Sequence, residues 1–220
     1  MIVYCLPLLL SVTLAMSTST ASPTLYFGYG SNMWREQMSL RCPNSIFEGI
    51  GRLDDYEWII NDRGYANVVA SSLLGLEHTD KNWGVWGMIY MLTSADEERL
   101  DSNEGVPHIY GKELLDVNFW SAEGGEAGCR SIDVEKDESE KRKMLVYVDY
   151  NRTTPSKPKE EYIYRMNQGV ADAVKAGIPE EYVKGVVRKY IPEEEGGGAG
   201  EGDGNVRALA EQQARKFEDE

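Results

Sequence analysis

The stretch Leu25-Tyr26-Phe27-Gly28-Tyr29-Gly30-Ser31-Asn32-Met33 ("LYFGYGSNM") decides the start of the fold. Its aromatic and apolar residues are typical of a buried strand, and none of its side chains is charged. The glycines that follow allow a tight turn into a helix predicted for residues 33–41, with Asn32 as N-cap. Such a turn collects backbone N–H groups at a helix start, where a carboxylate or a developing oxyanion binds. An ordinary strand-to-helix turn has the same pattern, so the pattern alone leaves both roles open.

Familiar motifs do not explain this turn. Gly28 and Gly30 begin a Gly-x-Gly-x-x-Gly pattern, but Met33 stands where the third glycine is needed, which excludes a dinucleotide fingerprint. A nucleophile elbow around Ser31 requires a glycine at the same position. Any ligand of this turn would therefore be bound mainly by its backbone N–H groups.

The composition narrows the range of partners. Against 23 basic side chains the chain carries 37 acidic ones, a formal charge of −14 over 220 residues. Nucleic acids and anionic membrane surfaces require a basic footprint, so we expect neither as the main partner. Two histidines and three cysteines without metal-ligand spacing predict no metal site.

The two ends differ from the middle. Residues 1–21 carry no charge, and their apolar run has the length of a signal-peptide core but is shorter than the roughly 20 residues of a membrane span. No basic residue precedes the run, so a secretory leader and an N-terminal extension both stay open, and with them the compartment. Residues 193–220 are predicted to be an acidic, glycine-rich flexible tail, in which a short final helix is the alternative. One folded domain is expected over 24–192.

Within that domain, strands dominate the first two thirds and helices gather late, which favours an α+β fold with a closed or nearly closed sheet. Residues 136–143 are predicted to be a charged hairpin loop and 153–162 a proline-stiffened loop. The expected helices span 93–105, 160–177 and 179–192, and the expected strands cover 25–30, 45–61 (two strands), 67–75, 82–92, 111–120, 128–135 and 144–150.

Three blocks in order carry a family resemblance: "LYFGYGSNM" at 25–33, "VWGMIYMLTSADEERLDSNEGV" at 85–106, and "TTPSKPKEEYIYRMNQGVADAVKAGIPEEY" at 153–182. Together they resemble the γ-glutamylcyclotransferase family, in a fungal-type form, over about 25–192. The resemblance implies a small closed β-barrel with flanking helices. It also implies an enzyme that cyclises a γ-glutamyl amino acid or peptide to 5-oxoproline and frees the amine, without any cofactor. A small γ-glutamyl molecule would be its partner and the cytoplasm its usual location, and a homodimer is left open.

The same resemblance suggests site residues. Glu104 matches the catalytic acid/base of the family. It is expected at a helix C-terminus, where the helix dipole disfavours an anion and so should raise the pKa of the carboxyl group. A general base that works near neutral pH needs a pKa raised in this way. A solvated surface glutamate is the alternative for Glu104, and a helix-packing aromatic is the alternative for Tyr162. The substrate-binding residues that the resemblance implies are Tyr26, Phe27, Gly28, Tyr29, Gly30, Ser31, Asn32, Tyr110 and Tyr162.

Three classes of function remain open on the sequence. The first is the cyclising enzyme, and Asn32 favours general γ-glutamyl amino acids for it, because the related glutathione-specific branch usually carries leucine there. The second is a non-catalytic relative that binds a small carboxylate at the same turn. The third is a hydrolase or transferase acting on another γ-glutamyl conjugate. The acidic residue at 104 favours an enzyme, since a binding module needs no acid/base there.

Overall fold

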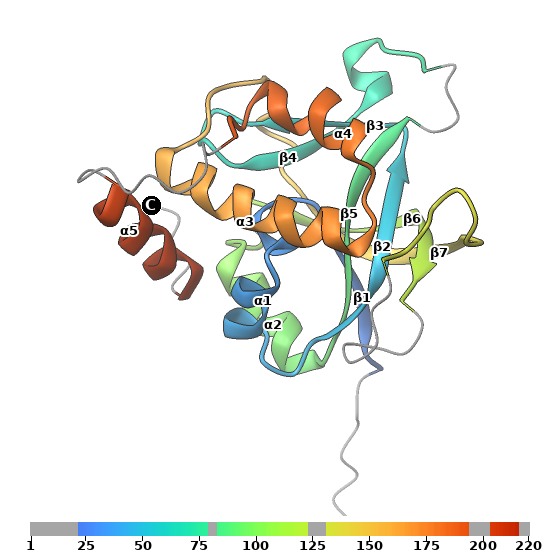
Figure 1. Cartoon of the computed structure of the whole chain (residues 1–220), viewed down its shortest axis with the longest axis horizontal. Coiled ribbons are helices and arrows are strands. Elements are labelled where there is room, and N and C mark those ends of the chain that lie inside the picture. Colours follow the sequence, from blue (N-terminus) through green and yellow to red (C-terminus); the bar gives the residue numbers. More distant parts are fainter. Residues whose placement is uncertain (1–21, 79–82, 123–130, 194–202, 216–220) are drawn as a thin grey trace, which may run out of the picture.

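A computed structural model describes residues 22–78, 83–122, 131–193 and 203–215. Its centre is a closed five-stranded barrel, and β3 and β4 form a separate two-stranded sheet beside it (Figure 1). β1 pairs antiparallel with β5 and parallel with β7, which closes the barrel. The α+β prediction with a small closed barrel and flanking helices is therefore confirmed. In barrel order the strands are β1 (Thr24–Gly28), β5 (Gly84–Leu92), β2 (Ile46–Asp54), β6 (Gly111–Ser121) and β7 (Glu140–Val148); the small sheet is β3 (Tyr56–Ile60) and β4 (Ala66–Ala70).

The barrel closes around apolar side chains and bends at one glycine. The register between β2 and β5 shifts between Phe47 and Gly49, and Gly49 has φ +148°, a conformation that favours glycine. A Cβ at this position would lie 2.1 Å from the Trp120 carbonyl oxygen, so no other residue fits. The completely buried side chains of the core include Phe27, Ile50, Met88, Ile89, Val117 and Met144.

Helices surround the barrel. The long helix α3 crosses it in Figure 1, and α5 lies beside α3 and α1. α3 ends where Gly177 takes a left-handed conformation, as predicted. Of the two forms that the sequence allows for the last segment, the structure has the helix, α5. The helices are α1 (Arg35–Arg41), α2 (Ser94–Asn103), α3 (Glu160–Ala176), α4 (Glu180–Gly185) and α5 (Asp203–Arg215), with short 3-10 turns η1 (Ser31–Met33), η2 (Ser71–Leu74) and η4 (Val187–Lys189).

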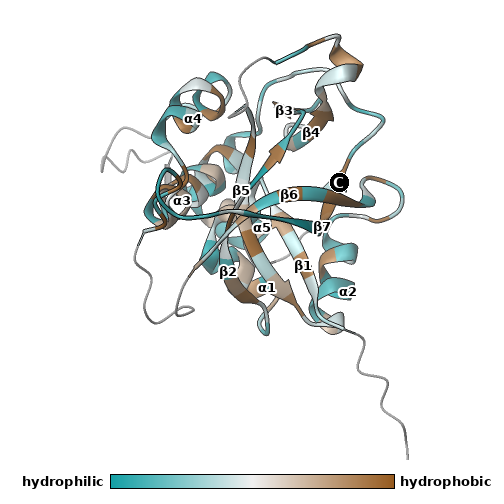
Figure 2. Ribbon diagram, turned by 90° about the vertical axis from the view of Figure 1, so that its right-hand side faces the viewer, coloured by the Kyte–Doolittle hydropathy of each residue, from teal (hydrophilic) through white to brown (hydrophobic). Residues whose placement is uncertain are grey.

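Four local predictions are wrong. Residues 131–135 form a turn instead of a strand, because the Asp133 carboxylate accepts the Glu135 N–H at 3.2 Å and closes the backbone on itself. The charged hairpin loop predicted for 136–143 is only partly a loop. β7 begins at Glu140, so residues 140–143 belong to the strand that pairs with β6, and this strand is coloured as hydrophilic in Figure 2. The strand predicted for 67–75 ends at Ala70 and continues as η2, and the helix predicted for 179–192 divides into α4 and η4.

Some predictions fall outside the described residues. These are the leader or extension at 1–21, the glycine-rich part of the tail, and the first residues, 128–130, of the strand predicted for 128–135. Within the described ranges, no helix combines the length and apolar character that crossing a bilayer requires.

Candidate active site

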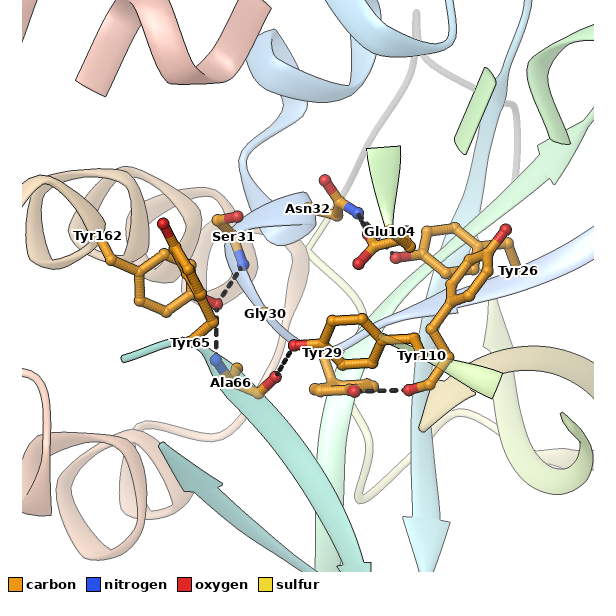
Figure 3. A pocket seen from close by; sticks show the side chains of 11 residues that line it. Tyr26, Tyr29, Gly30, Ser31, Asn32, Tyr65, Ala66, Glu104, Tyr110 and Tyr162 are labelled. Atoms are coloured by element: carbon orange, nitrogen blue, oxygen red, sulfur yellow. Dashed lines mark hydrogen bonds between the residues drawn. The ribbon is translucent and has the colours of Figure 1, made fainter. Parts of the chain in front are cut away.

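A pocket opens where β1 ends and η1 begins, with the end of α2 on its other side (Figure 3). It is a tight pocket, with a cavity volume of about 30 Å³. The structure brings together there eight of the ten predicted site residues: Tyr26, Tyr29, Gly30, Ser31, Asn32, Glu104, Tyr110 and Tyr162. Tyr65, Ala66 and Tyr147 complete the lining.

Glu104 faces this pocket as the C-cap residue directly after α2. Thr93 caps the start of the helix through its side chain, and the completely buried Leu100 fixes it to the core. Gly105 follows with φ +65° and turns the chain away from the helix. The side chain of Glu104 is only 9% exposed, and its Oε1 accepts a hydrogen bond from Asn32 Nδ2 at 3.1 Å. The alternative of a solvated surface carboxylate is therefore excluded.

The sequence predicts Asn32 as a helix N-cap, and this is wrong: Asn32 is a buried residue of η1. Its Oδ1 accepts hydrogen bonds from Gln37 Nε2 at 2.8 Å and Arg41 Nη1 at 2.9 Å. These two donors fix the orientation of the amide. Its Nδ2 therefore points to the Tyr26 hydroxyl at 2.9 Å and to Glu104. The cap position of α1 belongs instead to Trp34, which makes no side-chain cap bond.

The Tyr162 hydroxyl lies at the opposite wall of the pocket (Figure 3). Its oxygen accepts the backbone N–H groups of Ser31 at 3.2 Å and Ala66 at 3.3 Å. The approach requires glycine at position 30, since a Cβ there would lie 2.8 Å from the Tyr162 oxygen. Burial raises the pKa of Tyr162 to about 12, so the phenol is neutral at physiological pH and keeps a hydrogen to donate.

Three other tyrosines use their hydroxyl hydrogens within the protein. Tyr29 donates to the Tyr147 carbonyl at 2.6 Å, and Tyr110 donates to the Ala66 carbonyl at 3.0 Å. The Tyr147 hydroxyl donates to Asp101 Oδ1 at 2.7 Å. These bonds make the tyrosines rigid wall residues. Tyr26 and Tyr162, by contrast, accept hydrogen bonds in the described structure, and each keeps a hydrogen for a ligand.

A buried ion pair supports the turn from behind. Arg165 is completely buried; its Nε donates to Glu161 Oε2 at 2.8 Å and its Nη1 to Ser31 Oγ at 3.0 Å. Gln37 Nε2 also donates to Ser31 Oγ, at 3.0 Å. The Ser31 hydroxyl is thus held as an acceptor and is not set up as a nucleophile. The i,i+4 spacing of Glu161 and Arg165 beside Tyr162 is the sequence signal that would have indicated this support.

Phe27 and Gly28, both expected to bind substrate, do not line the pocket. Side chains alternate along β1, so Phe27 points into the barrel core and is completely buried there. A Cβ at Gly28 would lie 3.3 Å from the Tyr26 ring and 3.4 Å from Asn32 Cβ. The structure therefore gives Phe27 a core role, and Gly28 makes room for two pocket residues.

A larger groove of about 700 Å³ lies elsewhere, near α4 and the ends of β2 and β5. Trp86 and Trp120 stack there with ring centroids 5.0 Å apart, and Arg52 lies over both rings. The groove shares no lining residue with the tyrosine-lined pocket. We assign the candidate active site to the smaller pocket, because the predicted acid/base and the backbone turn meet there.

Comparison with known proteins agrees with this picture. The AIG2-like family model matches residues 84–186. Bovine γ-glutamylcyclotransferase is 25% identical over 168 residues, which cover 70% of this chain and 88% of the bovine protein. The human γ-glutamylcyclotransferase is 30% identical over 109 residues, 49% of this chain and 57% of the human one. A solved γ-glutamyl cyclotransferase has the same fold, with a TM-score of 0.58 and 19% identity over 87% of this chain and 99% of its own.

The fold and the pocket define a closed-barrel protein in which the buried Glu104 carboxylate faces a glycine turn. The match to the AIG2-like model and the relatives named γ-glutamylcyclotransferase support this chain as a member of the γ-glutamylcyclotransferase family. Its resemblance to fungal-type members stays a prediction.

Proposed function

We propose that this protein is a γ-glutamylcyclotransferase that converts a γ-glutamyl amino acid or peptide into 5-oxoproline and a free amine. Relatives of that name at 25% and 30% identity support the general activity. One observation carries the proposal: the Glu104 carboxylate, 9% exposed and bound by the Asn32 amide, lines the same pocket as Gly30 and Ser31.

The reaction needs no protein nucleophile. A bond forms between the α-nitrogen of the substrate and its own γ-carbonyl carbon, and the bond from that carbon to the leaving nitrogen breaks. Two protons leave the α-ammonium nitrogen as it becomes the lactam N–H, and two reach the leaving nitrogen, which departs as an ammonium group. Glu104 relays these protons, so they balance over the cycle. Folding the glutamyl chain so that the amine and the carbonyl meet lowers the activation free energy, since orientation alone contributes up to roughly 7–11 kcal/mol in favourable cases.

The remaining charges of the substrate require hydrogen-bond donors. Its α-carboxylate and the tetrahedral oxyanion would accept hydrogen bonds from the hydroxyls of Tyr162 and Tyr26, whose hydrogens are not used by other described residues. The buried Arg165 guanidinium, paired with Glu161, holds Ser31 Oγ from behind. Donors held in place before the reaction cost no reorganisation during it.

The test is product analysis. The full chain is incubated with γ-glutamyl-alanine and with glutathione, and 5-oxoproline and glutamate are measured by mass spectrometry. We expect 5-oxoproline and the free amine from at least one substrate. Substrate whose α-amine is acetylated is the matched control and should be inert, because it has no nucleophile. Release of glutamate, or turnover of the acetylated substrate, would instead indicate a hydrolase. A chain inert on every γ-glutamyl compound would favour the non-catalytic binding module.

A further inference from the structure

Arg41 connects the C-terminal helix to the candidate active site. It is the last residue of α1 and is 4% exposed, and its three side-chain nitrogens donate hydrogen bonds to α5 and to Asn32. Its Nε donates to the Ala214 carbonyl at 3.3 Å and its Nη2 to the Gln213 carbonyl at 3.2 Å. Its Nη1 donates to Asn32 Oδ1 at 2.9 Å. One guanidinium therefore binds α5 and the residue that holds Glu104.

The two carbonyls lie in the last described turn of α5. Helix carbonyls point toward the C-terminal, negative end of the helix dipole, where a cation is favourable. α5 is also seated by Ala210 and Ala214, both completely buried, although neither belongs to the barrel core. The docked helix thus supplies hydrogen-bond acceptors to the buried Arg41, and Arg41 supplies donors to two helix carbonyls.

We propose that Arg41 is a positioning residue and that docking of α5 orients the catalytic carboxylate through Asn32. With α5 in place, the guanidinium plane is fixed by two carbonyls, and its third contact holds Asn32 Oδ1. Nδ2 of the same amide then points to Glu104 Oε1. The inference rests on the proposed function in that Glu104 is the acid/base.

Release of α5 removes two of the acceptors that fix Arg41. Without the two carbonyls that set its plane the guanidinium can turn, and the Asn32 amide then loses one of the donors that fix its orientation. A rotated amide presents its oxygen to the carboxylate instead of an N–H. The effect falls on kcat more than on KM, because it changes the proton-transfer group and leaves in place the Tyr162 hydroxyl, which binds Ser31 and Ala66.

The test uses the full chain with two matched variants of α5. Ala210→Asp places a carboxylate at a completely buried position and should release the helix, whereas Ala208→Asp makes the same change at an exposed position. Hydrogen–deuterium exchange of α5 reports the release. For Ala210→Asp we expect kcat about ten- to a hundredfold lower, the range for losing a hydrogen bond to a charged group, and KM within about threefold. The acidic limb of its pH profile should move to higher pH, because a carboxylate without its N–H donor binds a proton more readily. Ala208→Asp should match the wild type.

Arg41→Lys tests the same connection from the other side and replaces the first test if Ala210→Asp does not fold. Lysine keeps the charge but cannot bind three acceptors in one plane, so kcat should again fall with a shifted pH profile. In an Asn32→Ala background, Arg41→Lys should have no further effect on kcat, since both act on one contact. A released α5 with wild-type kcat and pH profile, or additive effects of Arg41→Lys and Asn32→Ala, would overturn the inference.

Failure of the proposed function is distinguishable from failure of this connection. A wild type without 5-oxoproline production would refute the function. The connection is then read from hydrogen exchange of residues 30–33, which should accelerate in Ala210→Asp and not in Ala208→Asp. Unchanged exchange there, with α5 released, would refute the connection by itself.

Discussion

Replacing Tyr162 by phenylalanine removes one oxygen at the point where two backbone donors meet. The N–H groups of Ser31 and Ala66 both donate to that oxygen, at 3.2 and 3.3 Å. Phenylalanine refills the ring position, which is 3% exposed, so apolar packing is kept. A buried donor left without an acceptor costs about 1–3 kcal/mol. Because water can reach the gap through the pocket mouth, we place the sum for both donors at roughly 2–4 kcal/mol.

Tyr26→Phe is the matched control. The site is equally buried, at 4% exposure, and among the described residues the lost oxygen accepts a hydrogen bond only from Asn32 Nδ2. That nitrogen carries two hydrogens and keeps Glu104 as the acceptor for one of them, so one buried N–H loses its acceptor instead of two. The free energy of unfolding should therefore fall by about half as much, roughly 1–2 kcal/mol.

Urea unfolding of the three proteins measures both differences by linear extrapolation, with equal m-values as the check on two-state behaviour. For a chain of this size the Tyr162→Phe loss corresponds to a melting temperature about 4–16 °C lower. A Tyr162→Phe protein no less stable than Tyr26→Phe would refute the reasoning, because it would show that the two amides do not depend on this oxygen.

Three further predictions concern the same network. Burial raises the pKa of Tyr162 from 10.0 to about 12, so its contribution to stability is complete below about pH 10 and is lost as the pH rises toward 12; alkaline unfolding curves of wild type and Tyr162→Phe should therefore converge. Gly30→Ala places a Cβ 2.8 Å from the Tyr162 oxygen and should cost about 1–3 kcal/mol in urea unfolding, whereas Gly185→Ala meets nothing within 4 Å and should not destabilise; equal stabilities would contradict the close approach. Arg165→Met leaves the buried Glu161 carboxylate without its guanidinium and should cost about 3–5 kcal/mol, and a loss under 1 kcal/mol in the same assay would contradict a buried pair.

The sequence was sufficient for the barrel because local signals and tertiary packing agree there. Strand propensity and the glycine turn at 28–30 indicate β1 and its end, and Thr93 indicates the start of α2. The turn at 131–135 was missed because a carboxylate closed the backbone locally within an otherwise strand-like segment. Such a bond competes with sheet pairing and leaves little trace in composition.

The site residues that lie within short sequence motifs were predictable, whereas the residues that hold them in place from distant parts of the sequence were not. Eight of the predicted residues meet in one pocket, whereas Phe27 fails because strand alternation turns it into the core. The bond from Arg165 to Ser31 spans 134 positions, and the bond from Arg41 to Ala214 spans 173. No local pattern encodes partners so distant, since they are brought together only by the closed fold.

The rate of 5-oxoproline formation by Glu104→Gln tests the central claim most directly. Glutamine keeps the shape of the side chain and cannot take up a proton, so kcat/KM on γ-glutamyl-alanine should fall at least about a hundredfold. Glu98→Gln, at an exposed position on the same helix, should retain wild-type activity. A folded Glu104→Gln protein as active as the wild type would contradict proton transfer by the buried carboxylate.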